Sequence, residues 1–202
     1  MKEENIMRNV KEDIILSGVG GQGVLSMASI IALAAVKQGC MVRQSEIHGM
    51  AQRGGIVQVH LRISDRVIEC DLIPKKSASF IISLEPLESL RSLEYLAEDG
   101  FIITALEPVL NIVNYPEREY ILKHLKSLPQ YAALDLEKVR ENRMHCPNTI
   151  LVGVASICLS IAEDRFEEAI HEQFRHKGDK IIRNNIEAFY FGREMKLPVN
   201  IN

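Results

Sequence analysis

The sequence predicts an α/β fold in which helices cover both faces of a mostly parallel sheet. Short apolar runs at 14–16, 80–83 and 101–104 have the length and composition of buried parallel strands. Helical periodicity follows the first of these runs, and the last third of the chain is helical throughout. Strands that alternate with helices in this way indicate a Rossmann-like three-layer sandwich.

The individual elements follow from the local pattern. A helix beginning at Gln22 ends at Gly39, and a second strand at 41–43 completes a strand–helix–strand unit. A strand at 56–63 is expected to return through 67–70 as a β-hairpin excursion. The remaining expected elements are a helix with leucines at 87, 90, 93 and 96 that ends at Gly100, a short helix around 121–125, a strand at 131–134, a helix after Asp135, and helices at 148–161, 164–175 and 179–195.

Length and composition indicate one soluble domain. The chain has 202 residues, of which 47% are hydrophobic and 25% charged, and we expect a single domain over 1–202 with a polar N-terminal extension at 1–12. A net charge of -3 offers no electrostatic reason to bind nucleic acid or an anionic membrane. The N-terminal residues lack the apolar segment of a signal peptide, so a cytoplasmic location is expected.

The cysteines are dispersed along the chain. Cys40, Cys70, Cys146 and Cys158 form no CxxC pair and have no histidine at metal-ligand spacing. Iron–sulfur clusters and structural zinc require clustered thiolates, so we expect buried free thiols and no metal bound by this chain alone. If the protein takes part in redox chemistry, electrons would pass through another chain.

A glycine-rich turn joins the first strand to the first helix. Gly18, Gly20 and Gly23 have the G-x-G-x-x-G spacing, with Gly21 and Gln22 between them. Such a turn lets the backbone approach an anion, and the helix dipole favours negative charge there. A dinucleotide site would also need an acid at the end of the second strand, where Arg43 stands instead. Three interpretations stay open: NAD(P) binding, binding of another anion or a partner's cofactor, and turn geometry alone.

A polar segment at 45–55 is the second candidate. It is expected to be a loop beyond the carboxyl end of the second strand, where open α/β sheets form ligand crevices. The guanidinium of Arg53, which precedes two glycines, can reach a carboxylate or phosphate with little hindrance. The alternative is a surface loop with incidental polarity. The candidate residues are Ser45, Glu46, His48, Gln52, Arg53, Gly54 and Gly55.

The other polar residues form no catalytic set. His60 lies among apolar neighbours in a strand and is expected to be structural. His171 and His176 are five residues apart and do not share a helix face, and no base is matched to Cys146.

These motifs together resemble a known family. The glycine turn at 18–24, the Arg53-Gly54-Gly55 loop, the segment 148–153 and the segment 185–192 resemble, in this order, the gamma subunit of 2-oxoacid:ferredoxin oxidoreductases, also known from pyruvate/ketoisovalerate oxidoreductases. The fuller loop at 45–55 is similar to the beta subunit of the indolepyruvate type.

The resemblance implies a function that the residues alone do not. An arylpyruvate or another 2-oxoacid is decarboxylated on thiamine diphosphate, the acyl group passes to coenzyme A, and iron–sulfur clusters carry electrons to ferredoxin. A large alpha subunit is expected to hold the thiamine diphosphate and the clusters in a hetero-oligomer. This chain is then expected to bind no cofactor itself and to be inactive alone. The alternatives are a stand-alone NAD(P)-binding oxidoreductase and a non-catalytic anion-binding assembly module.

Overall fold

The computed structural model describes residues 10–48, 54–136, 139, 146–195 and 200–201. Within them, a sheet of seven strands has the order β2-β3-β1-β4-β5-β6-β7. The strands are β1 Lys11–Val19, β2 Met41–His48, β3 Ile56–Ser64, β4 Ala78–Ser83, β5 Leu96–Ala105, β6 Gln130–Leu134 and β7 Asn200–Ile201. The helices are α1 Val24–Lys37, α2 Pro86–Arg91, the 3-10 helix η1 Ser92–Tyr95, α3 Arg118–Lys126, α5 Pro147–Ser156, α6 Glu163–Phe174 and α7 Asp179–Glu194.

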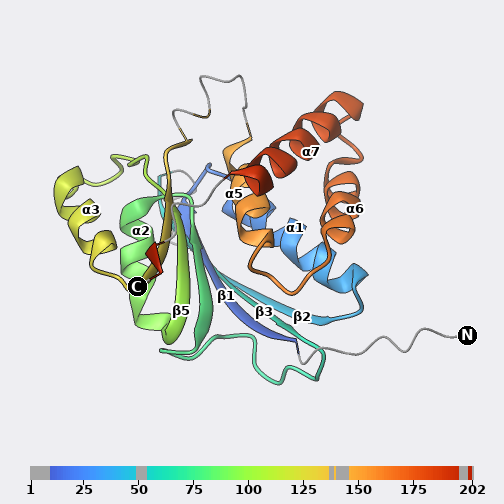
Figure 1. Ribbon diagram of the computed structural model, residues 1–202, viewed down its shortest axis with the longest axis horizontal. Helices are drawn as coiled ribbons and strands as arrows, with labels where there is room; N and C mark the ends of the chain where they lie inside the picture. The colour runs from blue at the N-terminus through green and yellow to red at the C-terminus, as the bar shows by residue number, and fades with distance from the viewer. Residues whose placement is uncertain (1–9, 49–53, 137–138, 140–145, 196–199, 202) are drawn as a thin grey trace, which may run out of the picture.

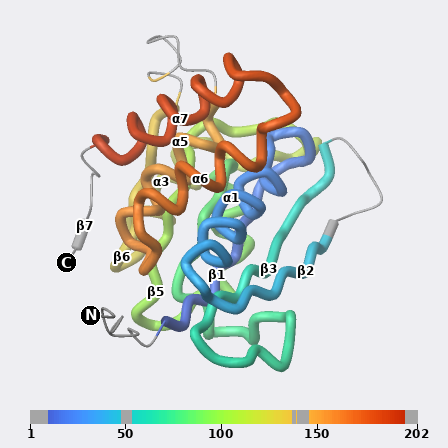
Figure 2. The backbone as a smooth tube through the Cα atoms, turned by 90° about the vertical axis from the view of Figure 1, so that its right-hand side faces the viewer, coloured from blue at the N-terminus to red at the C-terminus, as the bar shows by residue number. Residues whose placement is uncertain are grey.

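The expected α/β fold is confirmed. β1, β4, β5 and β6 are parallel neighbours, and β2 has the same direction because β3 lies antiparallel between β1 and β2. Helices α1, α5, α6 and α7 cover one face of the sheet, and α2 and α3 cover the other (Figure 1). Each face has its own apolar core, and the larger core includes the buried residues of α1. Helix α1 lies over β1 and β3 (Figure 2).

The hairpin excursion exists, but its partner strand was predicted wrongly. β3 pairs with β2, from Met41 opposite Ser64 to His48 opposite Val57, and not with residues 67–70. Residues 67–70 belong to an irregular loop, whose Cys70 and Leu72 carbonyls accept hydrogen bonds from Arg62. Because β3 lies between β1 and β2, both of its edges are already paired, and a return strand from that loop has no free edge to join.

Three further boundaries differ from the expectation, the first being the end of the helix expected at 148–161, which lies at Ser156. The leucine stripe after residue 86 is helical only as far as Tyr95, and β5 begins at Leu96, so that Gly100 lies buried within a strand rather than ending a helix. β1 starts at Lys11, which brings Glu12 into the sheet from the expected polar extension. The helix expected after Asp135 lies largely outside the described residues.

Helices α5 and α7 pack with their backbones almost in contact. A Cβ atom at Gly153 would lie 2.1 Å from the Phe189 carbonyl oxygen, and one at Gly192 would lie 2.1 Å from the Ile150 carbonyl oxygen. Only glycine fits at either position, because the atoms in the way belong to the backbone of the facing helix. Thr149 also donates a hydrogen bond to Asn185 across this interface, with 2.6 Å between the oxygens.

We predict that Gly153→Ala and Gly192→Ala each lower the free energy of unfolding by about 2 kcal/mol or more, because the added methyl group must push the helices apart. Asn184→Ala, on the exposed side of α7, is the matched control and should change stability by less than about 0.5 kcal/mol. Urea denaturation measures both. Equal stability of the glycine variants and the control would contradict the close packing.

Glu12 is a buried acid at the amino end of β1. Its side chain is 5% exposed; one carboxylate oxygen accepts the Ser160 backbone N–H at 2.6 Å, and the other has no hydrogen-bond partner among the described residues. Burial raises the pKa of Glu12 above its ordinary value of 4.5, while the Ser160 hydrogen bond opposes that rise. The folded state therefore binds this proton more tightly than the unfolded chain does.

A raised pKa has a definite consequence for stability. Between pH 4.5 and the higher pKa of folded Glu12, the folded state holds more protons, so its stability falls as the pH rises. Glu12→Gln should remove this part of the decline in urea titrations made across that range. Glu98→Gln, at an exposed position of β5, should leave the decline unchanged. An unaltered pH profile in Glu12→Gln would contradict the assignment.

Candidate functional site

The glycine-rich turn connects β1 to α1 at the carboxyl edge of the sheet. Gly21 and Gly23 have φ angles of +101° and +93°, in the left-handed region that side chains disfavour. A Cβ atom at Gly23 would also lie 2.9 Å from the Asn148 side-chain nitrogen, so this glycine lets α1 begin directly beside α5. The turn therefore brings the N-termini of two helices together.

Gln22 holds the turn in place. Its carboxamide oxygen accepts the Val19 N–H at 2.7 Å, and its nitrogen donates to the Leu84 carbonyl oxygen at 2.9 Å. The side chain thus joins the end of β1 to the residue that follows β4. Gly18 makes this possible, since a Cβ atom there would lie 2.8 Å from the same carboxamide oxygen. Two of the candidate residues, Gly18 and Gln22, are therefore explained by the geometry of the turn.

A cavity of about 660 Å³ opens beside the turn. Gly21 and Gly23 line it from the turn that leads into α1, and Pro147 and Asn148 line it from the first turn of α5. The positive ends of both helix dipoles are thus at its wall, which favours a negatively charged ligand. The other residues that line the cavity are Gln22, Ser26, Leu84, Glu107, Val109, Leu136, Cys146, Phe174, Lys177 and Asn185.

The α5 side of the cavity was not identified from the sequence. Asn185 is 5% exposed; it accepts the Thr149 hydroxyl and donates to the Ile181 carbonyl oxygen, so it connects the start of α5 to α7. Lys177 brings a positive charge to the cavity, and its ammonium group lies 5.5 Å from the Phe174 ring centre. The proline at the first position of α5 was the available signal for a helix N-terminus.

Cys146 precedes α5 at this cavity. Burial raises the pKa of its thiol, so the thiol stays protonated near neutral pH and is a poor nucleophile. All four cysteines are free, as expected, but none of them is fully buried, which corrects the expectation of buried thiols: Cys40 and Cys146 are half-buried, and Cys70 and Cys158 are exposed. Both lie in connecting segments, where the local chain does not cover them.

The structure separates the residues of the 45–55 segment. Ser45, Glu46 and His48 lie on β2, an edge strand, and not in a loop as expected, because β2 continues to pair with β3 as far as His48. Glu46 is exposed and accepts a hydrogen bond from Gln44 at 3.0 Å. Neither Ser45 nor Glu46 lines the cavity.

The end of the same segment does meet the turn. The Gly20 N–H donates to the Gly55 carbonyl oxygen at 2.8 Å, and the Gly54 carbonyl oxygen accepts a hydrogen bond from Asn111. Gln52 and Arg53 lie outside the described residues. That Arg53 faces the same crevice as the turn therefore stays a prediction.

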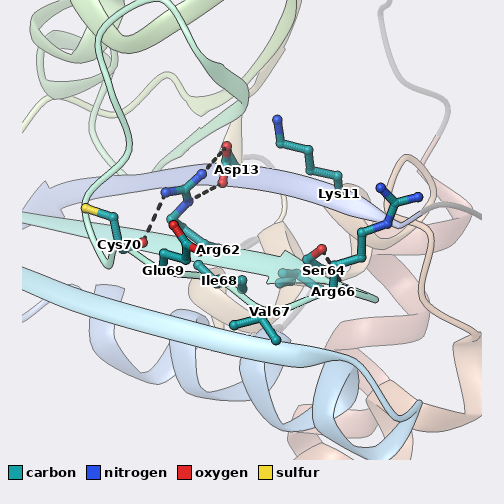
Figure 3. A pocket seen from close by; sticks show the side chains of 10 residues that line it. Lys11, Asp13, Arg62, Ser64, Arg66, Val67, Ile68, Glu69 and Cys70 are labelled. Atoms are coloured by element: carbon teal, nitrogen blue, oxygen red, sulfur yellow. Dashed lines mark hydrogen bonds and ion pairs between the residues drawn. The ribbon is translucent and has the colours of Figure 1, made fainter.

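A second hollow, of about 410 Å³, lies at the opposite edge of the sheet (Figure 3). Its central Arg62 forms a two-pronged ion pair with Asp13, at 2.7 and 3.1 Å, and donates to the carbonyl oxygens of Cys70 and Leu72. The guanidinium is therefore engaged in fastening the 65–77 loop to β1. The central cation of this hollow is therefore already paired within the protein.

The remaining titratable groups of the described residues form no metal centre. His60 is buried, its Nδ1 atom accepts the Ile73 N–H at 3.0 Å, and burial lowers its pKa, so the expected structural histidine is neutral. In the part of the chain that the structure describes, no three His, Cys, Asp or Glu side chains are grouped as metal ligands. None of the helices described there is long and apolar enough to cross a membrane.

We predict that Gln22→Glu lowers the free energy of unfolding by about 1–3 kcal/mol, because a carboxylate cannot donate to the Leu84 carbonyl oxygen and brings negative charge against it. Gln38→Glu is the control: Gln38 joins Ala162 and Ser160 in the same manner, but at an exposed site, where water can replace the lost bond. Equal losses in urea denaturation would contradict the role given to Gln22.

The fold and the cavity define a class of protein: an α/β protein with a cavity between two helix N-termini at the carboxyl edge of its sheet. Residues 13–195 match the family described as Pyruvate ferredoxin/flavodoxin oxidoreductase. The chain belongs to this family.

Similar proteins narrow the relationship. The chain is 33% identical to the Indolepyruvate oxidoreductase subunit IorB of Archaeoglobus fulgidus, with 89% of this chain and 92% of the relative aligned. It is 28% identical to the Pyruvate/ketoisovalerate oxidoreductases common subunit gamma of Thermococcus litoralis, over 88% of this chain and 95% of the relative.

Solved structures confirm the fold. The pyruvate oxidoreductase subunit PORC of Thermotoga maritima superposes with a TM-score of 0.69 at 21% identity, covering 95% of this chain and 99% of that one. The 2-oxoglutarate:ferredoxin oxidoreductase of Magnetococcus marinus, solved with 2-oxoglutarate, coenzyme A and succinyl-CoA bound, gives a TM-score of 0.71 at 17% identity over 92% of this chain. This chain spans only 31% of that larger chain.

Proposed function

We propose that the protein is the cofactor-free subunit of a 2-oxoacid:ferredoxin oxidoreductase of the indolepyruvate type. Such an enzyme oxidatively decarboxylates an arylpyruvate on thiamine diphosphate, transfers the acyl group to coenzyme A and passes the electrons to ferredoxin. Family membership over residues 13–195 and the similarity to IorB subunits along most of the chain support this proposal. The observation that carries it is the anion-favouring cavity at the edge where the family motif lies.

The division of labour follows from the donor groups. Iron–sulfur clusters need several thiolates close together, whereas Cys40, Cys70, Cys146 and Cys158 lie in separate parts of the fold. We therefore assign the thiamine diphosphate and the clusters to a large alpha subunit, which passes electrons to ferredoxin. This chain would complete the complex and shape the active-site region.

The cavity is proposed to hold an anionic group of the reaction. Its two helix N-termini supply partial positive charge, and Lys177 supplies a full charge at the same wall. We favour a phosphate of coenzyme A over a substrate carboxylate or a partner's carboxylate, because a phosphate has the acceptor atoms to engage several of these donors at once. Arg53, which follows β2 in the sequence, is proposed to add a second positive charge.

Lys177→Ala and Arg53→Ala should each raise the KM for coenzyme A about tenfold in the reconstituted two-subunit enzyme, since each removes a charge-assisted hydrogen bond. Lys123→Ala, on the exposed surface of α3, is the control and should leave the KM unchanged. The isolated chain should show no turnover. An unchanged rate and unchanged coenzyme A affinity in both variants would refute the proposed role of the cavity.

A stand-alone NAD(P)-dependent oxidoreductase is the alternative that the glycine turn favours. The acid that could hold a ribose, Glu46, is on the exposed edge strand and does not line the cavity, which weighs against it. Saturable nicotinamide binding by the isolated chain in calorimetry would support this alternative. A non-catalytic assembly module would instead fail to form a stable complex with a thiamine-containing subunit.

A further inference from the structure

Glu85 begins α2 with a longer side chain than a helix cap needs. One of its carboxylate oxygens accepts the Glu88 N–H at 2.8 Å and so satisfies a free donor of the first helical turn. Aspartate, asparagine, serine and threonine usually make this bond, because their shorter side chains reach the backbone directly. Helix capping therefore explains one oxygen of Glu85 and not the choice of glutamate.

The second oxygen of Glu85 reaches a different part of the chain. It accepts the Val109 N–H at 3.3 Å and the Tyr115 hydroxyl, both from the segment 106–117 that joins β5 to α3 (Figure 1). Glu85 is 0% exposed, so water does not compete for these bonds. Burial and the hydrogen bond to Glu85 raise the pKa of Tyr115, so its hydroxyl remains a donor near neutral pH. A buried carboxylate thus ties the segment 106–117 to the start of α2.

The main chain of Glu85 is itself fixed to the end of the sheet. The Ser83 hydroxyl donates to the Glu85 carbonyl oxygen at 2.7 Å and accepts the Ser17 hydroxyl of β1 at 2.9 Å. The Leu84 N–H also donates to the Ser17 carbonyl oxygen at 3.0 Å. The carboxylate of Glu85 therefore extends from a main chain that is bound to both β1 and β4.

The segment that Glu85 holds supplies one wall of the cavity, because Glu107 and Val109 line it. The Leu106 N–H donates to the carbonyl oxygen at the end of β6 at 2.9 Å, and the Val109 N–H donates to Glu85. Glu107 and Pro108 lie between these two bonds, and Pro108 has no N–H with which to form another. This wall is therefore fixed at one end by the sheet and at the other by the carboxylate of Glu85.

We propose that Glu85 and Tyr115 are positioning residues of the cavity, which hold the wall at 107–109 in the place where it contacts the ligand. This rests on the proposed function, in which the cavity holds a phosphate of coenzyme A. Neither residue lines the cavity, so both act through the segment 107–109. The phosphates of coenzyme A are remote from its reacting thiol, so losing this positioning weakens binding without slowing the chemical steps.

Two variants of the reconstituted two-subunit enzyme test this role. Glu85→Asp keeps an acceptor for the Glu88 N–H, but its side chain is too short to hold the segment 106–117. Tyr115→Phe removes one hydroxyl and keeps the ring. Each variant should raise the KM for coenzyme A about fivefold and leave kcat unchanged, because each loses a hydrogen bond to a charged acceptor that holds the wall.

Two control variants separate positioning from a general loss of stability. Tyr120→Phe removes an exposed hydroxyl from α3, and Ile121→Val removes one carbon from the buried core under the same helix. Both should keep the wild-type KM, and urea denaturation measures the stability of all four variants. If Ile121→Val raises the KM as much as Tyr115→Phe does, the wall responds to stability alone and the positioning role is refuted.

Lys177→Ala separates this proposal from the proposed function. If Lys177→Ala raises the KM for coenzyme A while Glu85→Asp and Tyr115→Phe do not, the positioning role is wrong and the proposed function stands. If none of the three variants changes the KM, the cavity does not hold coenzyme A and both are overturned. A lower kcat at an unchanged KM in Tyr115→Phe would also refute the positioning role. If Glu85→Asp does not fold, the comparison of Tyr115→Phe with Tyr120→Phe decides the question.

Discussion

The Gln22 carboxamide joins the end of β1 to the residue after β4, and the carboxyl edge of the sheet is organised around that connection. It determines where the turn leaves the sheet and hence where α1 begins. Gly23 then lets α1 start against Asn148. The two helix N-termini converge only because these contacts are short, and the charge preference of the cavity depends on that convergence.

The walls of the cavity are held by different means on its two sides. On one side, α5 and α7 are locked by the glycine contacts at Gly153 and Gly192 and by the hydrogen bond from Thr149 to Asn185. On the other side, the described residues include no long helix to supply packing area; Glu85 there accepts the Val109 N–H and the Tyr115 hydroxyl of the irregular segment 106–117, together with the Glu88 N–H of α2. Polar anchoring replaces helix packing where the connecting segment must stay at the surface.

Much of the architecture could be predicted because it depends on local pattern. The strands around residues 14–16, 80–83 and 101–104, and the helices of the last third, have apolar periodicities that hardly depend on distant residues. The hairpin was assigned to the wrong partner for the opposite reason. The segment 67–70 has the composition of a strand, but pairing depends on which backbone lies alongside, and β2 occupied that place.

The sequence by itself determined the turn between the first strand and the first helix, since glycines at 18, 20 and 23 leave few other conformations. It also determined the family, through motifs spread along most of the chain. Only the tertiary structure decided what lies opposite the turn: Asn148, Lys177 and Asn185 reach the cavity from far along the chain. It likewise placed Ser45 and Glu46 away from the cavity. Spacing in the sequence encodes local geometry, whereas a site made by distant segments depends on how they pack.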